Sequence, residues 1–304
     1  MNVSVIICSH NPREEALSRT LSGLRNQDLA TSDWELILID NASDHPLQDR
    51  FDLSWHPNGR HITETELGLT PARLCGIRNA IAPLLLFVDD DNVLCPHYLS
   101  EGLKISEKYP FLGAWGGSQV AEYEKEPHPK LLKHMDMIAI RSVDREIWSN
   151  QYDWRTTPAG AGMAVRTHIA RSYMEKLATN ELMKGLDRKG ESLASGGDID
   201  MAYTAIDLGY GCGLFPSLYL HHLIPAGRTN EDYLIRLKAG ITYSGVIVGF
   251  QRGLNAPQKR LSGFALFLYQ LKQWITRDTF EYKLWKSEFD ARDRAYRDLD
   301  LYLK

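Results

Sequence analysis

The sequence contains little cysteine, and this scarcity limits the kinds of site the protein can have. Four of the 304 residues are cysteines, scattered along the chain without the spacing of a metal site: Cys8, Cys75, Cys95 and Cys212. This distribution favours reduced thiols in a cytosolic protein over a disulfide framework.

Basic charge and long apolar runs are also scarce. The chain has 35 Lys and Arg residues against 39 Asp and Glu residues, a net charge of −4, so no basic field favours nucleic acid. No apolar run approaches the roughly 20 residues that span a bilayer. The opening residues MNVSVIICSH lack the basic region and longer apolar segment of a signal peptide. We therefore expect a cytoplasmic protein that binds no nucleic acid.

What the sequence does contain is typical of an ordinary soluble globular protein. Hydrophobic residues make up 43% and charged residues 24% of the chain. Its most informative segment is PLLLFVDDDN at 83–92, a short apolar run that ends in three acids. Such a run predicts a buried strand of a parallel sheet, and α/β sheets bind ligands at the carboxyl ends of their strands.

Alternation along this strand places Asp89 and Asp91 on one side and Asp90 on the other. Two neighbouring carboxylates suit Mg²⁺ or Mn²⁺ holding a substrate phosphate. The alternative interpretation is a solvated acidic loop that follows a strand.

The rest of the first half alternates strands with helices. Apolar runs predict strands at 3–8, 34–39, 61–66 and 84–89, and helical spacing predicts helices at 13–27 and 69–81, with Thr70 as the N-cap of the latter. This pattern is typical of an α/β fold, a Rossmann-like, mostly parallel sheet flanked by helices.

The second half is less regular and ends in helices. Strands are expected near 113–120, 160–165 and 218–223, and helices at 167–177, 198–208, 231–250, 261–275 and 281–304. We expect one catalytic domain at 1–240, followed by a helical extension at 241–304.

Four segments, in order, resemble the family-2 glycosyltransferases of GT-A fold. They are VSVIICSHNPR, LILIDNASDH, LGLTPARLCGIRNAIAPLLLFVDDDN and LASGGDIDMAYTAIDLGYGCGLFPSLYLHHLIP. The third contains the family's DXD motif at the end of its strand. The resemblance implies an enzyme, a metal-assisted hexosyltransferase that moves a sugar from a UDP- or dTDP-linked donor with inversion. The acceptor would be a saccharide or lipid-linked saccharide, in polysaccharide or glycoconjugate biosynthesis. The resemblance also implies a nucleotide-binding half at 1–112 and an acceptor-binding half at 113–240 of the catalytic domain.

The chain also departs from the family pattern. The Glu of the family's Glu-Asp pair is Gly197, and the Asn of Ala-Arg-Asn is Leu74. The Gln-X-X-Arg-Trp signature of processive synthases is not visible, which favours single sugar addition. Gly197 supports one alternative, a catalytically silent nucleotide-sugar-binding scaffold. The other, a sugar-phosphate nucleotidyltransferase, would need a Gly-rich basic loop after its first strand, where SHNPREE stands.

The resemblance assigns roles around the donor. It gives Asp91 the metal directly, Asp89 the ribose and the metal's waters, and Asp40 the N3–H of a uracil or thymine ring. Asp40 could instead cap its own loop as an Asx turn. Nucleotide contacts are also expected from a set of polar residues near the strand ends: Ser9, Asn11, Arg73 and Asp90.

Two motifs in the second half supply the base and a further metal ligand. A positioned carboxylate should take the acceptor's proton, and Asp198 is expected to do so, with Asp200 second because it should face away on a helix. Asp198 could instead be an ordinary acid at a helix N-terminus. The resemblance implies a histidine at the metal. Because neighbouring strand residues face opposite sides, only one of His221 and His222 should reach it, and His222 is preferred. Arg228 could hold a phosphate.

Acceptor contacts are expected from aromatic and small residues of the middle region: Trp115, Gly117, Trp154 and Gly162. A core tryptophan and a tightly packed strand are the competing interpretations. The amphipathic stripe at 261–275, edged by Lys and Arg, is open to three interpretations. It could pack in the core, form a homodimer interface or meet the membrane surface. Packing in the core or at a dimer interface is favoured over the membrane, because the following helix offers a partner.

Overall fold

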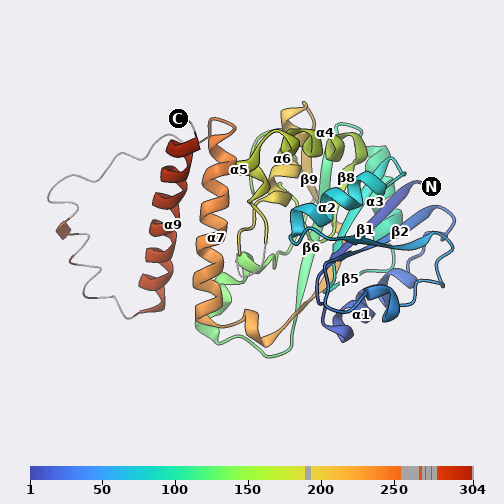
Figure 1. The fold of residues 1–304 in the computed structure, drawn as a ribbon, viewed down its shortest axis with the longest axis horizontal. Coiled ribbons are helices and arrows are strands. Elements are labelled where there is room, and N and C mark those ends of the chain that lie inside the picture. The colour runs from blue at the N-terminus through green and yellow to red at the C-terminus, as the bar shows by residue number, and fades with distance from the viewer. Residues whose placement is uncertain (189–192, 255–266, 269–270, 272–274, 276–278, 303–304) are drawn as a thin grey trace.

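The computed structural model describes residues 1–188, 193–254, 267–268, 271, 275 and 279–302 (Figure 1). Its centre is one mixed sheet of nine strands. These are β1 (Val3–Ser9), β2 (Trp34–Asn41), β3 (Gly59–Glu64), β4 (Leu84–Asp89), β5 (Asn92–Leu94), β6 (Leu112–Tyr123), β7 (Ile147–Ser149), β8 (Met163–Arg166) and β9 (Gly211–Ile224).

The first half of the sheet is parallel, as the sequence predicts. Strands run in the order β3-β2-β1-β4-β8-β6-β9-β5, and the first four are parallel to one another. Ser9 lies opposite Asp40, and Cys8 opposite Asp89, so the carboxyl ends of β1, β2 and β4 form one edge.

The second half of the sheet changes direction. β8 is antiparallel to β4 and to β6, while β9 is parallel to β6 and pairs antiparallel with β5 and β7. Short apolar strands look alike in either direction, so the sequence did not predict these reversals.

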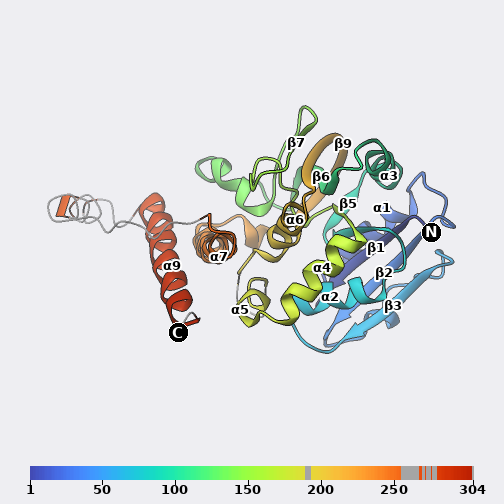
Figure 2. The same cartoon turned by 90° about the horizontal axis from the view of Figure 1, so that it is seen from above.

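Helices cover both faces of the sheet (Figure 2). α1 (Glu14–Arg25) and α3 (Tyr98–Lys108) pack on one face, and α2 (Leu69–Asn79), α4 (Thr167–Ala178) and α6 (Gly197–Asp207) on the other. Short helices connect these elements: η1 (Leu47–Asp49), η2 (Pro129–Ile138), α5 (Glu181–Lys184) and η3 (Ala226–Arg228). Because the central strands are covered twice, Ile6 and Ile7 are both fully buried although they face opposite sides.

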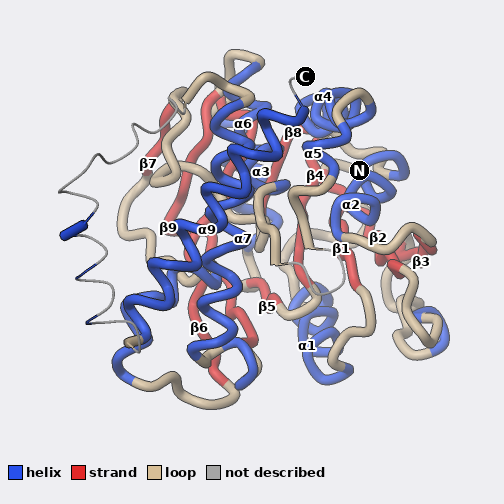
Figure 3. Tube along the Cα trace, turned by 60° about the vertical axis from the view of Figure 1, so that its left-hand side comes forward, coloured by secondary structure: helices blue, strands red, loops and turns tan. Residues whose placement is uncertain are grey.

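Two long helices, α7 (Glu231–Phe250) and α9 (Phe280–Tyr302), run side by side beyond the sheet (Figures 1 and 3). The Tyr243 hydroxyl donates to Asp298 at 2.8 Å, and the Arg294 guanidinium lies over the Tyr243 ring. α7 runs through residue 240, so the boundary expected from the sequence falls inside a helix.

Part of the expected apolar stripe lies outside the described residues, including Leu261, Phe264 and Trp274. Its described apolar members are all exposed: Phe267, Leu268, Leu271 and Ile275. For these four residues the core-packing interpretation is wrong, whereas the dimer interface and the membrane surface stay predictions, because periodicity marks an apolar face but not what covers it.

None of the described helices combines the length and apolar character needed to cross a bilayer.

Candidate active site

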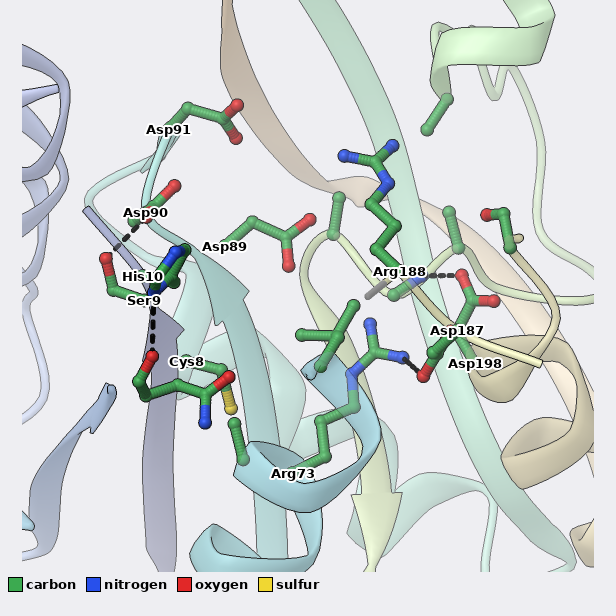
Figure 4. A pocket seen from close by; sticks show the side chains of 18 of the residues that line it. Cys8, Ser9, His10, Arg73, Asp89, Asp90, Asp91, Asp187, Arg188 and Asp198 are labelled. Atoms are coloured by element: carbon green, nitrogen blue, oxygen red, sulfur yellow. Dashed lines mark hydrogen bonds and ion pairs between the residues drawn. The ribbon is translucent and has the colours of Figure 1, made fainter. Parts of the chain in front are cut away.

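A cavity of about 260 Å³ opens at the carboxyl edge of the parallel strands. One wall carries the three acids at the end of β4, Asp89 to Asp91, and the opposite wall carries Asp187 and Asp198 (Figure 4). Arg188 extends between the two walls. The strands and helices predicted from the sequence thus bring both groups of carboxylates to one place.

The acidic wall is built at a turn. β4 ends at Asp89, so Asp90 and Asp91 leave the strand and the expected alternation stops there. All three acids line the cavity. Asp90 accepts a hydrogen bond from the Ser9 hydroxyl at 2.5 Å, which joins the ends of β4 and β1.

Asp91 is the most strongly bound of the three acids. Its Oδ2 lies 2.9 Å from Nη1 of Arg228, and its Oδ1 lies 3.5 Å from Nε2 of His222. The neighbouring Asn92 amide also donates to Oδ1 at 3.0 Å. His221, by contrast, is exposed and does not line the cavity, so His222 is the histidine that faces the acids.

The surroundings give the three acids different proton affinities. Burial raises the pKa of Asp89, and the charge of Asp91 adds to this effect. Burial and the same charge raise the pKa of Asp90 to about 7. Burial also opposes ionisation of Asp91, but contact with His222 and the charge of Arg228 hold its pKa below the usual range. Asp91 is therefore the acid best suited to remain an anion.

The opposite wall presents Asp198 from the first turn of α6. Its Oδ2 accepts from the Gly160 amide at 2.8 Å, and its Oδ1 accepts from the Ile199 amide at 2.9 Å. A carboxylate oxygen can accept about two hydrogen bonds, so each oxygen keeps room for a substrate proton.

Asp200 faces away from the cavity, as the helical spacing predicts. It is fully buried, and its Oδ1 lies 2.7 Å from both Lys176 Nζ and Arg252 Nη2. Arg252 also contacts Asp207 at the end of α6. These pairings fix α6 against α4 and the end of α7, so the contacts of Asp200 serve the fold rather than the cavity.

Arg73 lines the cavity floor but is not a simple surface arginine. Its side chain is 5% exposed, and its Nη1 lies 3.1 Å from Oδ2 of Asp187. The helix α2 begins at Leu69 with Gly68 as its N-cap, so Thr70 is not the N-cap that the sequence predicted. The Thr70 hydroxyl instead donates a hydrogen bond to Asp187 at 3.1 Å.

The strand ends near the expected nucleotide site hold one another. Asp40 is buried and accepts backbone N–H bonds from Ser43 and Leu47, and it does not line the cavity. Asn11, also outside the lining, exchanges hydrogen bonds with Asp44. The base-binding role of Asp40 and the nucleotide role of Asn11 stay predictions.

The expected acceptor residues do not line the cavity. Trp115 is fully buried beneath the Arg166 guanidinium, so its prediction as a sugar platform is wrong. A Cβ on Gly117 would lie 1.8 Å from the Leu218 carbonyl oxygen, and Gly162, at φ +76°, packs under the Tyr98 hydroxyl. Both glycines therefore serve close packing. The acceptor role was expected for them because residue type alone does not tell which side of the sheet a residue faces.

Trp154 is different, because it is 66% exposed and lies against Arg141. It remains a candidate acceptor contact outside the cavity. Sequence reasoning missed several lining residues. Asn41 lies within the segment LILIDNASDH, so its motif could have identified it. No periodic or motif signal was available for the others: Met137, Ile138, Ala139, Asp187 and Arg188.

Two of the residues that line the cavity, Asp91 and His222, fit a divalent cation. Among the described residues, no three or more His, Cys, Asp or Glu side chains form a ready-made metal cluster. A carboxylate and an imidazole nitrogen do meet at Asp91 and His222, and His222 Nδ1 is buried without a partner. Carboxylate oxygens, such as those of Asp91, are the ligands that suit Mg²⁺ and Mn²⁺.

Two solved structures share the fold of this chain. The mannosyltransferase PcManGT from Pyrobaculum calidifontis, in complex with GDP-Man and Mn²⁺, matches 97% of this chain and 86% of its own, with a TM-score of 0.57 and 15% identity. TarS 1–349 of S. aureus, in complex with UDP-GlcNAc, matches 98% of this chain and 92% of its own, with a TM-score of 0.55 and 15% identity. They confirm the predicted GT-A fold.

Sequence comparison identifies the family as well as the fold. Polypeptide N-acetylgalactosaminyltransferase 8 of Drosophila melanogaster is 38% identical over 93 residues, which are 29% of this chain and 16% of that protein. The sequence model of the family described as Glycosyl transferase family 2 matches residues 4–173, more than half of the chain. Together with the acids gathered at the carboxyl edge of the sheet, this match shows that the chain belongs to glycosyl transferase family 2.

Proposed function

We propose that this protein is an inverting, metal-assisted hexosyltransferase that uses a UDP- or dTDP-linked sugar. One observation carries the proposal: a single cavity holds three acids at the end of β4 and Asp198 on the facing wall. A donor diphosphate needs cations beside it, and an attacking hydroxyl needs a base across from it. The two walls supply groups for both needs.

The bond changes follow from this placement. The acceptor hydroxyl oxygen forms a bond to the anomeric carbon from the side of Asp198. The bond from that carbon to the diphosphate oxygen breaks, and its electron pair leaves with the nucleoside diphosphate. The hydroxyl proton passes to an oxygen of Asp198, whose backbone contacts at Gly160 and Ile199 fix its direction. Attack opposite the leaving group inverts the anomeric centre.

The cavity offers groups that would neutralise the charge of the leaving diphosphate. Asp91 and His222 would hold Mn²⁺ or Mg²⁺, with Asp89 beside them. When bound, such an ion neutralises charge that develops on the diphosphate. Arg188 and Arg228 line the same space, and a planar guanidinium suits phosphate oxygens. Arg73, which is paired with Asp187, would contact the nucleotide or diphosphate of the donor from the side of α2.

The nucleotide and the cellular role rest on the family resemblance. Ser9, at the end of β1, lines the cavity, and Asp40 lies one strand away, so the uracil or thymine ring would bind at these strand ends. Trp154 would contact the saccharide or lipid-linked acceptor from outside the cavity. We place the reaction in cytoplasmic polysaccharide or glycoconjugate assembly.

The silent-scaffold alternative rested on Gly197, which removes one acid from the family's Glu-Asp pair. Asp198, the second member of that pair, still lines the cavity, which favours an enzyme.

The test is turnover of a panel of nucleotide sugars. Purified protein with Mn²⁺ is incubated with UDP- and dTDP-linked hexoses, and release of the free nucleoside diphosphate is measured with and without simple saccharide acceptors. We expect release from at least one donor and its loss in Asp198→Ala. Donor binding without any release would favour the scaffold, and formation of nucleotide sugar from a sugar phosphate would favour a nucleotidyltransferase.

A further inference from the structure

Asp187 is a buried carboxylate in the loop that leads from α5 to α6, and it has three partners. It accepts from the Thr70 hydroxyl at 3.1 Å, from Nη1 of Arg73 at 3.1 Å and from the Gly197 amide at 3.1 Å. Its side chain is 4% exposed. One carboxylate therefore connects α2, a loop and the first residue of α6.

The space this carboxylate occupies is the space of a missing side chain. A Cβ built on Gly197 would lie 2.2 Å from Oδ2 and 2.6 Å from Cγ of Asp187. Both distances are shorter than any real contact of such atoms, so position 197 cannot carry a side chain while Asp187 stays in place. Position 197 is also where the chain departs from the Glu-Asp pair that it otherwise resembles.

We propose that Asp187 supplies, from the loop, the carboxylate that the sequence pattern places at position 197. Asp187 is then a positioning residue, which acts on the reaction through Arg73 and the start of α6. This inference rests on the proposed function for its catalytic consequence, but its structural part does not.

The path from Asp187 to the base is short. The Asp187 carboxylate fixes Arg73, and a Cβ on Gly160 would meet Nη2 of Arg73 at 2.6 Å, so the arginine lies directly beneath Gly160. The Gly160 amide in turn donates to Asp198 at 2.8 Å. A displaced Arg73 would therefore move the backbone that orients Asp198.

The electrostatics fit the same arrangement. Burial raises the pKa of Asp187, and the charge of Arg73 opposes that rise. Burial disfavours the charged form of Arg73, while Asp187 and then Asp198 hold its pKa above the usual value. Each buried charge thus depends on the other.

A carboxylate swap tests the proposal. The variants are Asp187→Ala, Gly197→Glu and the double change D187A/G197E, with D187A/G197D as a second swap that needs less space. Gly245→Glu is the matched control, because Gly245 is also helical and a Cβ there meets nothing within 4 Å. Thermal unfolding and the kcat and KM for the donor are measured for each.

We expect both single changes to lower the unfolding temperature and kcat, and the control to change neither. The double variant should recover about tenfold in kcat over Asp187→Ala, since groups in one network couple strongly. The effect should fall on kcat more than on donor KM, because Asp187 orients the base rather than the nucleotide.

Two results would overturn the inference. A double variant no more stable than Asp187→Ala would show that the carboxylate cannot be moved to position 197. Stability restored without kcat would leave Asp187 a packing residue only. If wild type turns over no donor, the proposed function fails, and the unfolding measurements still decide whether the two positions exchange the carboxylate.

Discussion

Replacement of Asp198 by Asn is the sharpest single test of the active site. The change keeps the size of the side chain but removes its ability to take a proton. General-base catalysis contributes about 10²–10⁴-fold, which is about 2.7–5.4 kcal/mol of transition-state stabilisation at 1.36 kcal/mol per tenfold. We expect turnover to fall by this factor while the affinity for donor stays nearly unchanged, since the acids that face the donor lie on the other wall.

The structure also predicts a cost in stability. Asp198 now accepts from two backbone amides, at Gly160 and Ile199. An Asn has one acceptor oxygen, so one of these N–H groups loses its partner, at a cost of about 1 kcal/mol, the low end for a partly exposed site. The unfolding temperature should fall by a few degrees at most, far too little to explain the loss of turnover.

The assay is therefore a pair of measurements on one variant. Steady-state release of nucleoside diphosphate gives turnover, and calorimetry with the donor's nucleotide gives affinity. Asp232→Asn is the control, an exposed acid in the first turn of α7. Turnover within a few-fold of wild type would refute the assignment of Asp198 as base.

Three further predictions follow from the same contacts. UDP should bind more tightly with Mn²⁺ than with EDTA, and Asp91→Ala should erase the difference; equal affinities in wild type, measured by calorimetry, would contradict a metal at Asp91. Trp115→Ala should lower the free energy of unfolding by about 3–5 kcal/mol, as for a fully buried aromatic residue. Trp154→Ala should change that free energy little and weaken only acceptor binding. Denaturant unfolding and acceptor titration of both variants distinguish the two effects. Arg252→Met removes one partner of the buried Asp200 and should cost about 3–5 kcal/mol; a loss below 1 kcal/mol in urea unfolding would mean that Lys176 alone compensates the charge.

The sequence predicts the acidic wall well because its signals are local. The run before Asp89 is buried on both faces and therefore continuously apolar, so its end could be located to the residue. Asp198 stands at the start of a helix that glycine residues precede, and α6 begins within one residue of the prediction. Strand alternation predicts that only one of His221 and His222 faces the site, since neighbouring strand residues face opposite sides, and the structure identifies it as His222.

The rest of the site depends on contacts that no local pattern records. Asp187 and Arg73 are 114 positions apart, and the loop that carries Asp187 has no periodicity. Trp115 was assigned to the acceptor because tryptophan is common in sugar sites, but β6 turns this side chain into the core beneath Arg166. The reversed direction of β8 was equally hidden, because hydrophobic alternation is the same in both directions.

The pairing of Arg252 with α6 has a consequence for how much of the chain makes up the catalytic unit. Arg252 comes after α7, in the segment that the sequence assigned to a C-terminal extension, yet its guanidinium lies 2.7 Å from Asp200, two residues beyond Asp198 in α6. A protein shortened at residue 240 would keep every residue of the cavity but lose this contact. The smallest active fragment should therefore end beyond residue 252, and the so-called extension is in part an internal support of the helix that carries Asp198.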